Sequence, residues 1–172
     1  RAAEGAARKV AEEEAKRFVS ESEKKKAENK VEEIFGTSKF YIEQLYTWGN
    51  PEYCPKNAEI IVTYLIIINK SNIENMSENL SFYDIFIEKN QKSQNAVLSN
   101  ENKKICYKIN TTEKRNRESI EYTHRLEGKA EIEELTAIII HTGIKRLRNR
   151  IENTNIAFCF LDKEFAISEL QQ

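Results

Sequence analysis

The sequence is poor in residues that break or cross-link a chain, with two prolines, five glycines and three cysteines in 172 residues. Cys54, Cys106 and Cys159 are odd in number and widely spaced, so they provide neither a disulfide framework nor a metal-binding pair, and reduced thiols are expected. His124 falls in an alternating segment typical of a strand, and His141 has no Cys, Asp or second His near it at ligand spacing. We therefore assign neither histidine a role.

The sequence also lacks an excess of charge of one sign and a long apolar run. Its net charge is -1, which argues against a strongly electrostatic nucleic-acid or membrane surface over the whole chain and leaves a local patch open. The apolar run from Val62 to Ile68 is too short to span a bilayer, and no signal-peptide pattern is present. Length and composition predict one soluble, cytoplasmic domain without a membrane partner.

Residues 41–64 are the most informative stretch of the chain. A first segment mixes aromatic and β-branched residues and predicts a half-buried strand ending near Trp48. Gly49 and the two prolines, Pro51 and Pro55, then predict a loop. The almost continuously apolar segment from Glu59 to Ile68 predicts a core strand that is covered on both faces.

The remaining segments predict both helices and strands. Residues 1–35 are rich in Ala, Glu, Lys and Arg and predict a charged surface helix that ends at Gly36. Ile105–Ile109 could pair with the alternating residues from Ile120 to His124 as an antiparallel hairpin.

Spacing predicts an amphipathic helix over Ala130–Glu152, despite the β-branched run within it. The expected buried stripe of this helix is Ile140, Ile144, Leu147 and Ile151. Four basic side chains lie mostly off the stripe: Lys145, Arg146, Arg148 and Arg150. Favourable interaction with the helix dipole and contact with nucleic acid are the two interpretations of this cluster.

Two stretches, residues 43–51 and residues 146–172, resemble a branch of the Nudix superfamily that contains ADP-ribose pyrophosphatases and Nudix-related transcriptional regulators of NAD metabolism. Residues 80–87 resemble a strand of the same branch. Residues 43–51 read E-Q-L-Y-T-W-G-N-P, similar to E-Q-L-Y-T-F-G-D-P of that branch. Residues 146–172 begin R-L-R-N-R-I-E-N-T-N-I-A-F and end F-A-I-S-E-L-Q-Q, similar to its R-L-R-x-K-x-E-Y-T-x-I-A-F and F-T-L-x-E-L-Q. The two matches occur in the same order as in the family.

The resemblance implies a Nudix-type α/β/α sandwich, with a mixed sheet between the helix of the Nudix box and the helix Ala130–Glu152. On this interpretation residues 1–35 are a charged helix that includes a degenerate box helix, and the first strands of the fold are absent. Residues 36–165 are the core, with a polar hairpin insert near 90–127. Residues 166–172 begin a C-terminal helix, which in the regulators opens a winged helix-turn-helix.

The resemblance also implies a Mg²⁺ site. In the Nudix box, clustered carboxylates on a helix hold Mg²⁺, which bridges a diphosphate and activates water. Here Glu13 and Glu14 match the Glu pair of the box and are the expected catalytic and metal-binding residues. Lys9 takes the place of its Arg and Val10 that of another carboxylate, and Lys16 stands where Gly is expected.

Tyr46, Trp48, Lys56 and Phe82 are the substrate-binding residues that the resemblance implies. Phe82 matches an aromatic position of the branch, and Lys56 lies in the loop where the branch carries R-D-P-R-G. The ligand implied is ADP-ribose or a related nucleoside diphosphate, bound by a homodimer.

Three functions remain open at the level of sequence. The chain can be a Mg²⁺-dependent pyrophosphatase, a ligand-sensing regulator that binds without cleaving, or a non-catalytic remnant. DNA is an expected partner only through a winged-helix domain following residue 172. The segment K-V-A-E-E, residues 9–13, resembles the regulators more than the hydrolases.

Overall fold

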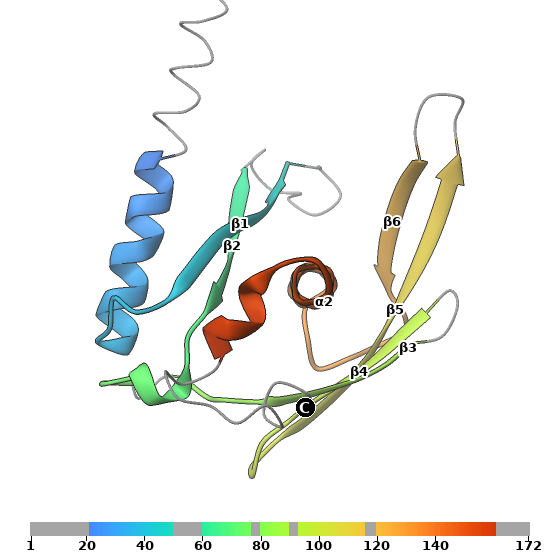
Figure 1. Cartoon of the computed structure of the whole chain (residues 1–172). Helices are drawn as coiled ribbons and strands as arrows, with labels where there is room; N and C mark the ends of the chain where they lie inside the picture. Colours follow the sequence, from blue (N-terminus) through green and yellow to red (C-terminus); the bar gives the residue numbers. More distant parts are fainter. Residues whose placement is uncertain (1–20, 50–59, 77–79, 90–92, 116–119, 161–172) are drawn as a thin grey trace, which may run out of the picture. The chain divides into compact units, whose positions relative to one another are not determined.

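The chain is a mixed α/β protein, and its described residues form two α-helices and two antiparallel sheets (Figure 1). The computed structural model describes residues 21–49, 60–76, 80–89, 93–115 and 120–160. It divides into two compact units, of which the first comprises residues 1–44, 64–78 and 156–172 and the second residues 45–63 and 79–155. The boundary passes through both strands of the smaller sheet, β1 (Tyr41–Trp48) and β2 (Ile61–Ile67).

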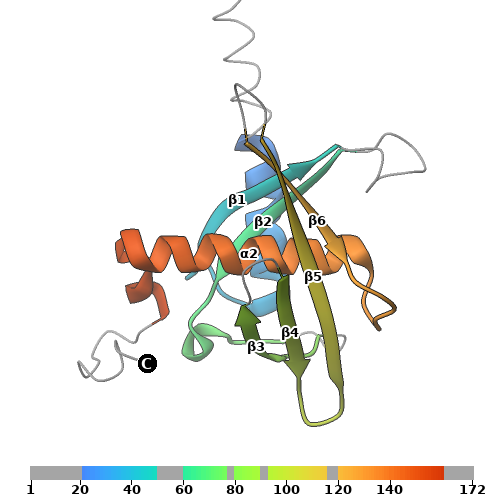
Figure 2. The same ribbon diagram turned by 90° about the vertical axis from the view of Figure 1, so that its right-hand side faces the viewer.

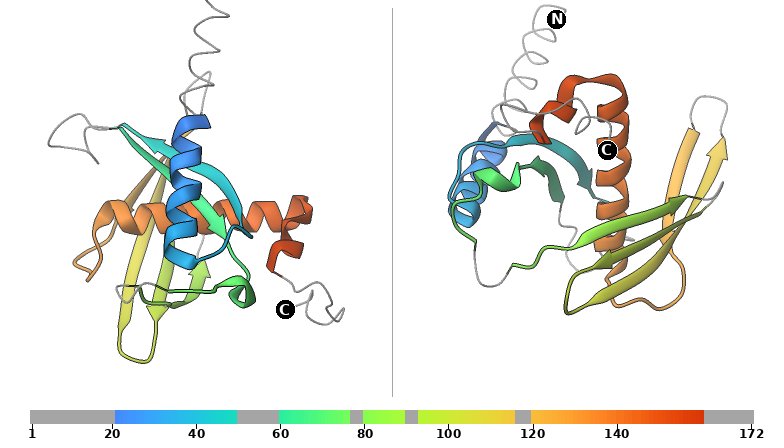
Figure 3. Two further views of the ribbon diagram at one scale, coloured as in Figure 1. Left: turned by 90° about the vertical axis from the view of Figure 1, so that its left-hand side faces the viewer. Right: turned by 60° about the horizontal axis from the view of Figure 1, so that its bottom comes forward.

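The first unit contains a helix over residues 21–35, the first half of β1 and the second half of β2. The helix lies beside these strand segments (Figure 3, left), and Val31 and Ile67 are buried in this unit. Exposed ion pairs one turn apart, such as Lys26 with Glu23 and Lys30 with Glu33, confirm a charged surface helix in its described part.

Two short 3₁₀ helices complete the described part of the first unit. They are η1 (Lys70–Asn72) and η2 (Asn155–Phe160). Asn69 caps η1 by accepting a hydrogen bond from the Ser71 amide, and its amide nitrogen donates to the Phe160 carbonyl over 3.3 Å. One side chain therefore joins the two 3₁₀ segments, which are far apart in the sequence.

The second unit contains a four-stranded antiparallel sheet in the order β3-β4-β5-β6. Its strands are β3 (Asp84–Lys89), β4 (Ser93–Ser99), β5 (Lys104–Arg115) and β6 (Ile120–Leu126). Consecutive strands are joined by short connections, and such connections permit only antiparallel pairing. β5 pairs with β4 as far as Asn110 and continues with β6 as a two-stranded ribbon (Figure 3, right).

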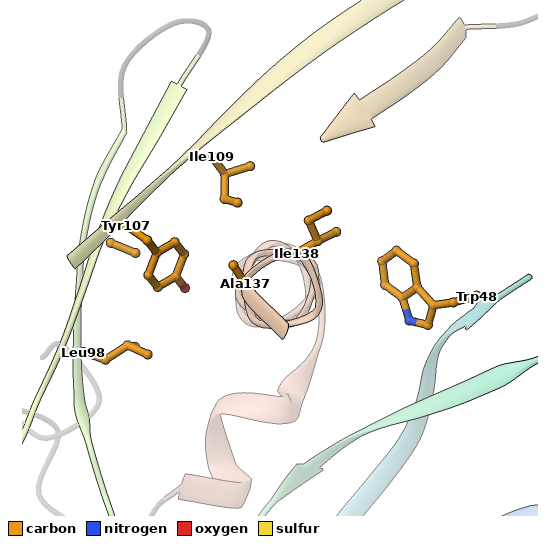
Figure 4. Packing of buried hydrophobic residues seen from close by; sticks show 7 residues of the cluster. Trp48, Leu98, Tyr107, Ile109, Ala137 and Ile138 are labelled. Atoms are coloured by element: carbon orange, nitrogen blue, oxygen red, sulfur yellow. The ribbon is translucent and has the colours of Figure 1, made fainter. Parts of the chain in front are cut away.

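Helix α2 (Glu134–Asn153) runs across one face of this sheet (Figure 2). Side chains alternate between the faces of a strand, and apolar side chains of β4 and β5 point toward α2. Ala96, Leu98, Tyr107 and Ile109 contribute to the core together with Ala137 and Ile138 of the helix. Figure 4 shows Trp48 on the side of α2 opposite to these sheet residues.

The expected mixed sheet is wrong for the described strands, because both sheets are antiparallel. The helix predicted over Ala130–Glu152 is confirmed as α2, which begins at Glu134. Its predicted stripe is only partly buried, because Ile140 packs against the core while Ile144 and Leu147 are half-buried. The buried residues of α2 are Ala137, Ile138, His141 and Gly143, whereas Ile151 is 45% exposed. The apolar run in this helix offers several stripes, and packing against the sheet selects one that periodicity did not identify.

The strand expectations are confirmed in part. β1 and β2 lie where predicted, and β5 and β6 pair as an antiparallel hairpin. The register differs from the expected pairing, since Ile109 opposes Leu126 and the earlier residues of β5 pair with β4. The expectation that both faces of β2 are covered is wrong. Residues 61–66 are half-buried and Ile67 is buried, while Ile60, just before the strand, is 71% exposed.

Candidate functional site

An exposed aromatic ring rests on a buried one at the end of β1. Tyr46 and Trp48 are two residues apart and therefore point to the same side of the strand. Their ring centroids are 4.6 Å apart and their planes are inclined by 53°. Trp48 is 6% exposed because it packs on α2, whereas Tyr46 is 53% exposed. The pair presents the ring of Tyr46 to solvent on a rigid support.

β2 holds this pair through one hydroxyl. The Trp48 indole Nε1 donates to Thr63 Oγ1 over 3.1 Å, and the same hydroxyl donates to the Tyr46 carbonyl over 3.1 Å. Both the buried ring and the backbone of the exposed one are thereby fixed. An aromatic face that is held in this way suits stacking with a planar ligand group such as a nucleobase.

A cation from α2 lies beside the same strand segment. The Arg146 Nη2 atom donates to the carbonyl of Leu45 over 3.3 Å, and this carbonyl belongs to the peptide group that carries Tyr46. The Leu45 side chain lies against α2 at Gly143, where an added Cβ atom would be 3.6 Å from Leu45 Cδ2, an ordinary van der Waals distance. The arrangement places a planar cation, a group suited to phosphate, at the backbone of the residue that precedes Tyr46.

The predicted site residues are only partly brought together. Tyr46 and Trp48 are in contact, whereas Phe82 lies in the segment before β3 of the other sheet and is 53% exposed. Glu13, Glu14 and Lys56 lie outside the described residues, so the Mg²⁺ site stays a prediction. Within the part of the chain that the structure describes, no group of three or more acidic, histidine or cysteine side chains could hold a metal ion.

Sequence reasoning missed the position of Arg146 and the pairing of the two histidines. Arg146 falls in the R-L-R segment that carries the resemblance, which is a signal for its importance but does not indicate its neighbour on β1. His124 of β6 and His141 of α2 have ring centroids 4.7 Å apart, inclined by 56°. Their contact joins the sheet to the helix.

The surroundings of His124 disfavour its charged form. Burial lowers the pKa of His124, and the positive charge of Lys145 lowers it further. Thr111 Oγ1 lies 3.0 Å from His124 Nδ1 in a hydrogen bond. The ammonium of Lys145 lies 5.1 Å from the centroid of the Tyr122 ring, in a cation–π contact. This cluster is a polar junction between β5, β6 and α2.

No family model, curated protein or solved structure matches this chain. Among the described residues, no helix has the length and apolar character needed to cross a membrane.

Proposed function

We propose that the chain is a Nudix-like domain that recognises ADP-ribose or a related nucleoside diphosphate. In this proposal the adenine ring stacks on Tyr46 and the diphosphate lies toward Arg146. The proposal includes the Nudix-type fold and the homodimer implied by the resemblance.

One observation carries the proposal. The exposed ring of Tyr46 is supported by Trp48, and the carbonyl of the preceding residue, Leu45, accepts a hydrogen bond from Arg146. A nucleoside diphosphate offers a planar base and a charged diphosphate on one flexible molecule. An aromatic face and a guanidinium are the two protein groups that such a ligand requires. Both residues fall within the two segments that resemble the Nudix branch.

Binding of ADP-ribose can be measured by isothermal titration calorimetry on the wild type and on Tyr46→Ala. Loss of one stacking contact costs about 1–3 kcal/mol, so affinity should fall roughly 5- to 150-fold. Tyr46→Phe retains the ring and should bind nearly as well as wild type. Tyr122→Ala is the matched control, because Tyr122 is 52% exposed and lies on β6.

Two results would contradict the proposed site. One is wild-type affinity in Tyr46→Ala, and the other is an equal loss in Tyr122→Ala. Absence of any heat with ADP-ribose, in folded wild-type protein, would contradict the ligand itself.

Analysis of the reaction products with the same protein distinguishes binding from hydrolysis. With Mg²⁺ added, a pyrophosphatase releases AMP and ribose 5-phosphate, and Glu13→Gln should abolish this release because the carboxylate holds the metal. Binding without release identifies the ligand-sensing alternative. Release that persists in Glu13→Gln would exclude the assigned role of that residue.

A further inference from the structure

The four-stranded sheet has a second face, turned away from α2. On β3, β4 and β5, the side chains that alternate with those packed against the helix form this second face, which we call the outer face. Figure 2 looks onto this face, with α2 behind it. By the strand register it consists of three rows: Asp84, Ser99 and Lys104; Phe86, Val97 and Cys106; Glu88, Asn95 and Lys108.

The middle row of the outer face is apolar. Phe86 is opposite Val97, and Val97 is opposite Cys106, so the row crosses three strands without interruption. Phe86 is 69% exposed and the Cys106 thiol is exposed as well. Neighbouring strands are about 4.8 Å apart, and the three side chains therefore form a contiguous ridge. Polar rows flank this ridge on both sides.

The flanking rows are polarised across the sheet. Asp84 and Glu88 lie on β3, while Lys104 and Lys108 lie on β5 two strands away. The β3 side of the outer face is therefore acidic and the β5 side basic. A rotation of 180° about an axis along β4 would place the acidic side of one copy against the basic side of another.

We propose that a second copy of this chain packs on the outer face, about a twofold axis that runs along β4 near Val97. Val97 then contacts Val97 of the other copy, and Phe86 of each copy contacts Cys106 of the other. Asp84 meets Lys104 in the same reciprocal way, as an isologous interface requires. Two twisted sheets pack face to face with their strands nearly aligned, about 10 Å apart, which fits an axis along the strands.

The size of the outer face predicts a weak, concentration-dependent dimer. Five residues along each strand and three strands across give a footprint of about 14 Å by 14 Å. This is small beside the roughly 800 Å² per partner of a stable interface. Lys108 already pairs with Glu127 over 2.8 Å, so Asp84 and Lys104 carry most of the charge complementarity. The inference rests on the homodimer of the proposed function and places its interface on the outer face. Its tests use no nucleotide, so they can fail while the proposed ligand site stands.

Disulfide trapping tests the arrangement directly. In a variant with Cys54→Ser and Cys159→Ser, Phe86→Cys leaves two thiols, the new one and Cys106. Within one chain these positions are two strands and thus about 10 Å apart, beyond the reach of a disulfide. Mild oxidation should therefore give a covalent dimer on a non-reducing gel, formed more completely as protein concentration rises.

Two controls accompany the trapping experiment. Ile85→Cys in the same background places a thiol on the same strand but on the face toward α2, at a position that is 50% exposed. It should remain monomeric on the gel, as should the background that retains Phe86. Circular dichroism checks that each variant is folded. Equal trapping by Ile85→Cys and Phe86→Cys would overturn the proposal.

Charge exchange provides a second measurement that needs no oxidation. Asp84→Lys and Lys104→Asp each bring like charges together across the axis, and each should weaken self-association by at least about fivefold in sedimentation equilibrium. The double variant Asp84→Lys, Lys104→Asp restores opposite charges and should recover the wild-type constant. A wild-type protein that stays monomeric at its solubility limit, or a double variant no better than the single ones, would overturn the proposal.

Discussion

At the scale of single residues, the packing around His124 makes its imidazole harder to protonate. Its ring lies between Thr111 of β5 and His141 of α2, with Lys145 contributing positive charge from the helix. Burial and that charge lower the pKa of His124. The folded chain therefore binds a proton at this ring less readily than the unfolded chain, where the pKa is about 6.5.

This difference predicts an acid-sensitive stability. The stabilisation due to neutral His124 is fully present above about pH 6.5 and is lost as the pH falls through the lower pKa of the folded state. Urea unfolding of the wild type should give a smaller free energy of unfolding near pH 5.5 than near pH 7.5. His124→Gln, which cannot titrate, should show a smaller decrease. Parallel pH profiles for the two proteins would contradict the prediction.

At the scale of elements, Gly36 explains where the N-terminal helix ends. Its φ of +67 lies in the left-handed region that glycine tolerates, and its amide donates to the Glu32 carbonyl over 2.9 Å. The Phe35 carbonyl then accepts the amides of Glu74 and Asn75. An added Cβ at Gly36 would lie 3.0 Å from Asn75 Nδ2 and 3.2 Å from Asn75 N. The helix end thus depends on a position without a side chain.

Three Gly→Ala variants separate the two costs at this position. Gly36→Ala should lower the free energy of unfolding by about 1–2 kcal/mol for the left-handed backbone, with a further loss from the close contact. Gly128→Ala has the backbone cost alone, because its φ is +74 and nothing lies within 4 Å of the added Cβ. Gly49→Ala has neither cost and should be nearly neutral. Urea titrations that rank Gly36→Ala level with Gly49→Ala would refute this account.

The elements also show what could be predicted from the sequence. Residues 41–48 could be assigned as a strand because aromatic and β-branched residues dominate them, and Gly36 marked the end of the helix. Strand β4 was not predicted from the sequence. Its alternating apolar pattern is limited to Ala96 and Leu98, which face the helix, and the surrounding Ser, Gln and Asn residues are typical of a loop.

The candidate site was predictable only in part, for a physical reason. Tyr46 could be singled out from its local motif. Arg146 contacts the Leu45 carbonyl across a separation of 101 residues, which no local pattern encodes. The contact between His124 and His141 likewise depends on how α2 packs on the sheet. Tertiary packing decides such pairs, and periodicity does not.

At the scale of the whole molecule, pairing and burial predict an uneven stability. β4 is paired along its length on both edges, and Ala96 and Ile109 are almost fully buried beneath α2. The outer half of β5, near Glu113 to Arg115, pairs with β6 on one edge and is exposed. Local opening of this end should be much easier than opening of β4.

Hydrogen exchange measured by mass spectrometry can test this ranking. Amides of β4 should exchange at least about tenfold more slowly than those of Glu113 to Arg115, equivalent to about 1.4 kcal/mol in opening free energy. The comparison is internal to one sheet and needs no substitution. Equal protection at the two places would show that the sheet opens as a single cooperative body.

Trp48 has a consequence for optical spectroscopy. It is the one tryptophan of the chain, it is 6% exposed, and its indole donates to a neutral hydroxyl. Indole emission shifts to longer wavelength when water reaches the ring, so the fluorescence colour of the protein reports a single location. That location is the contact of β1 with α2, directly beneath the aromatic ring of Tyr46. The chain thus contains its own fluorophore at the candidate site, and occupancy of the site can be followed without a label.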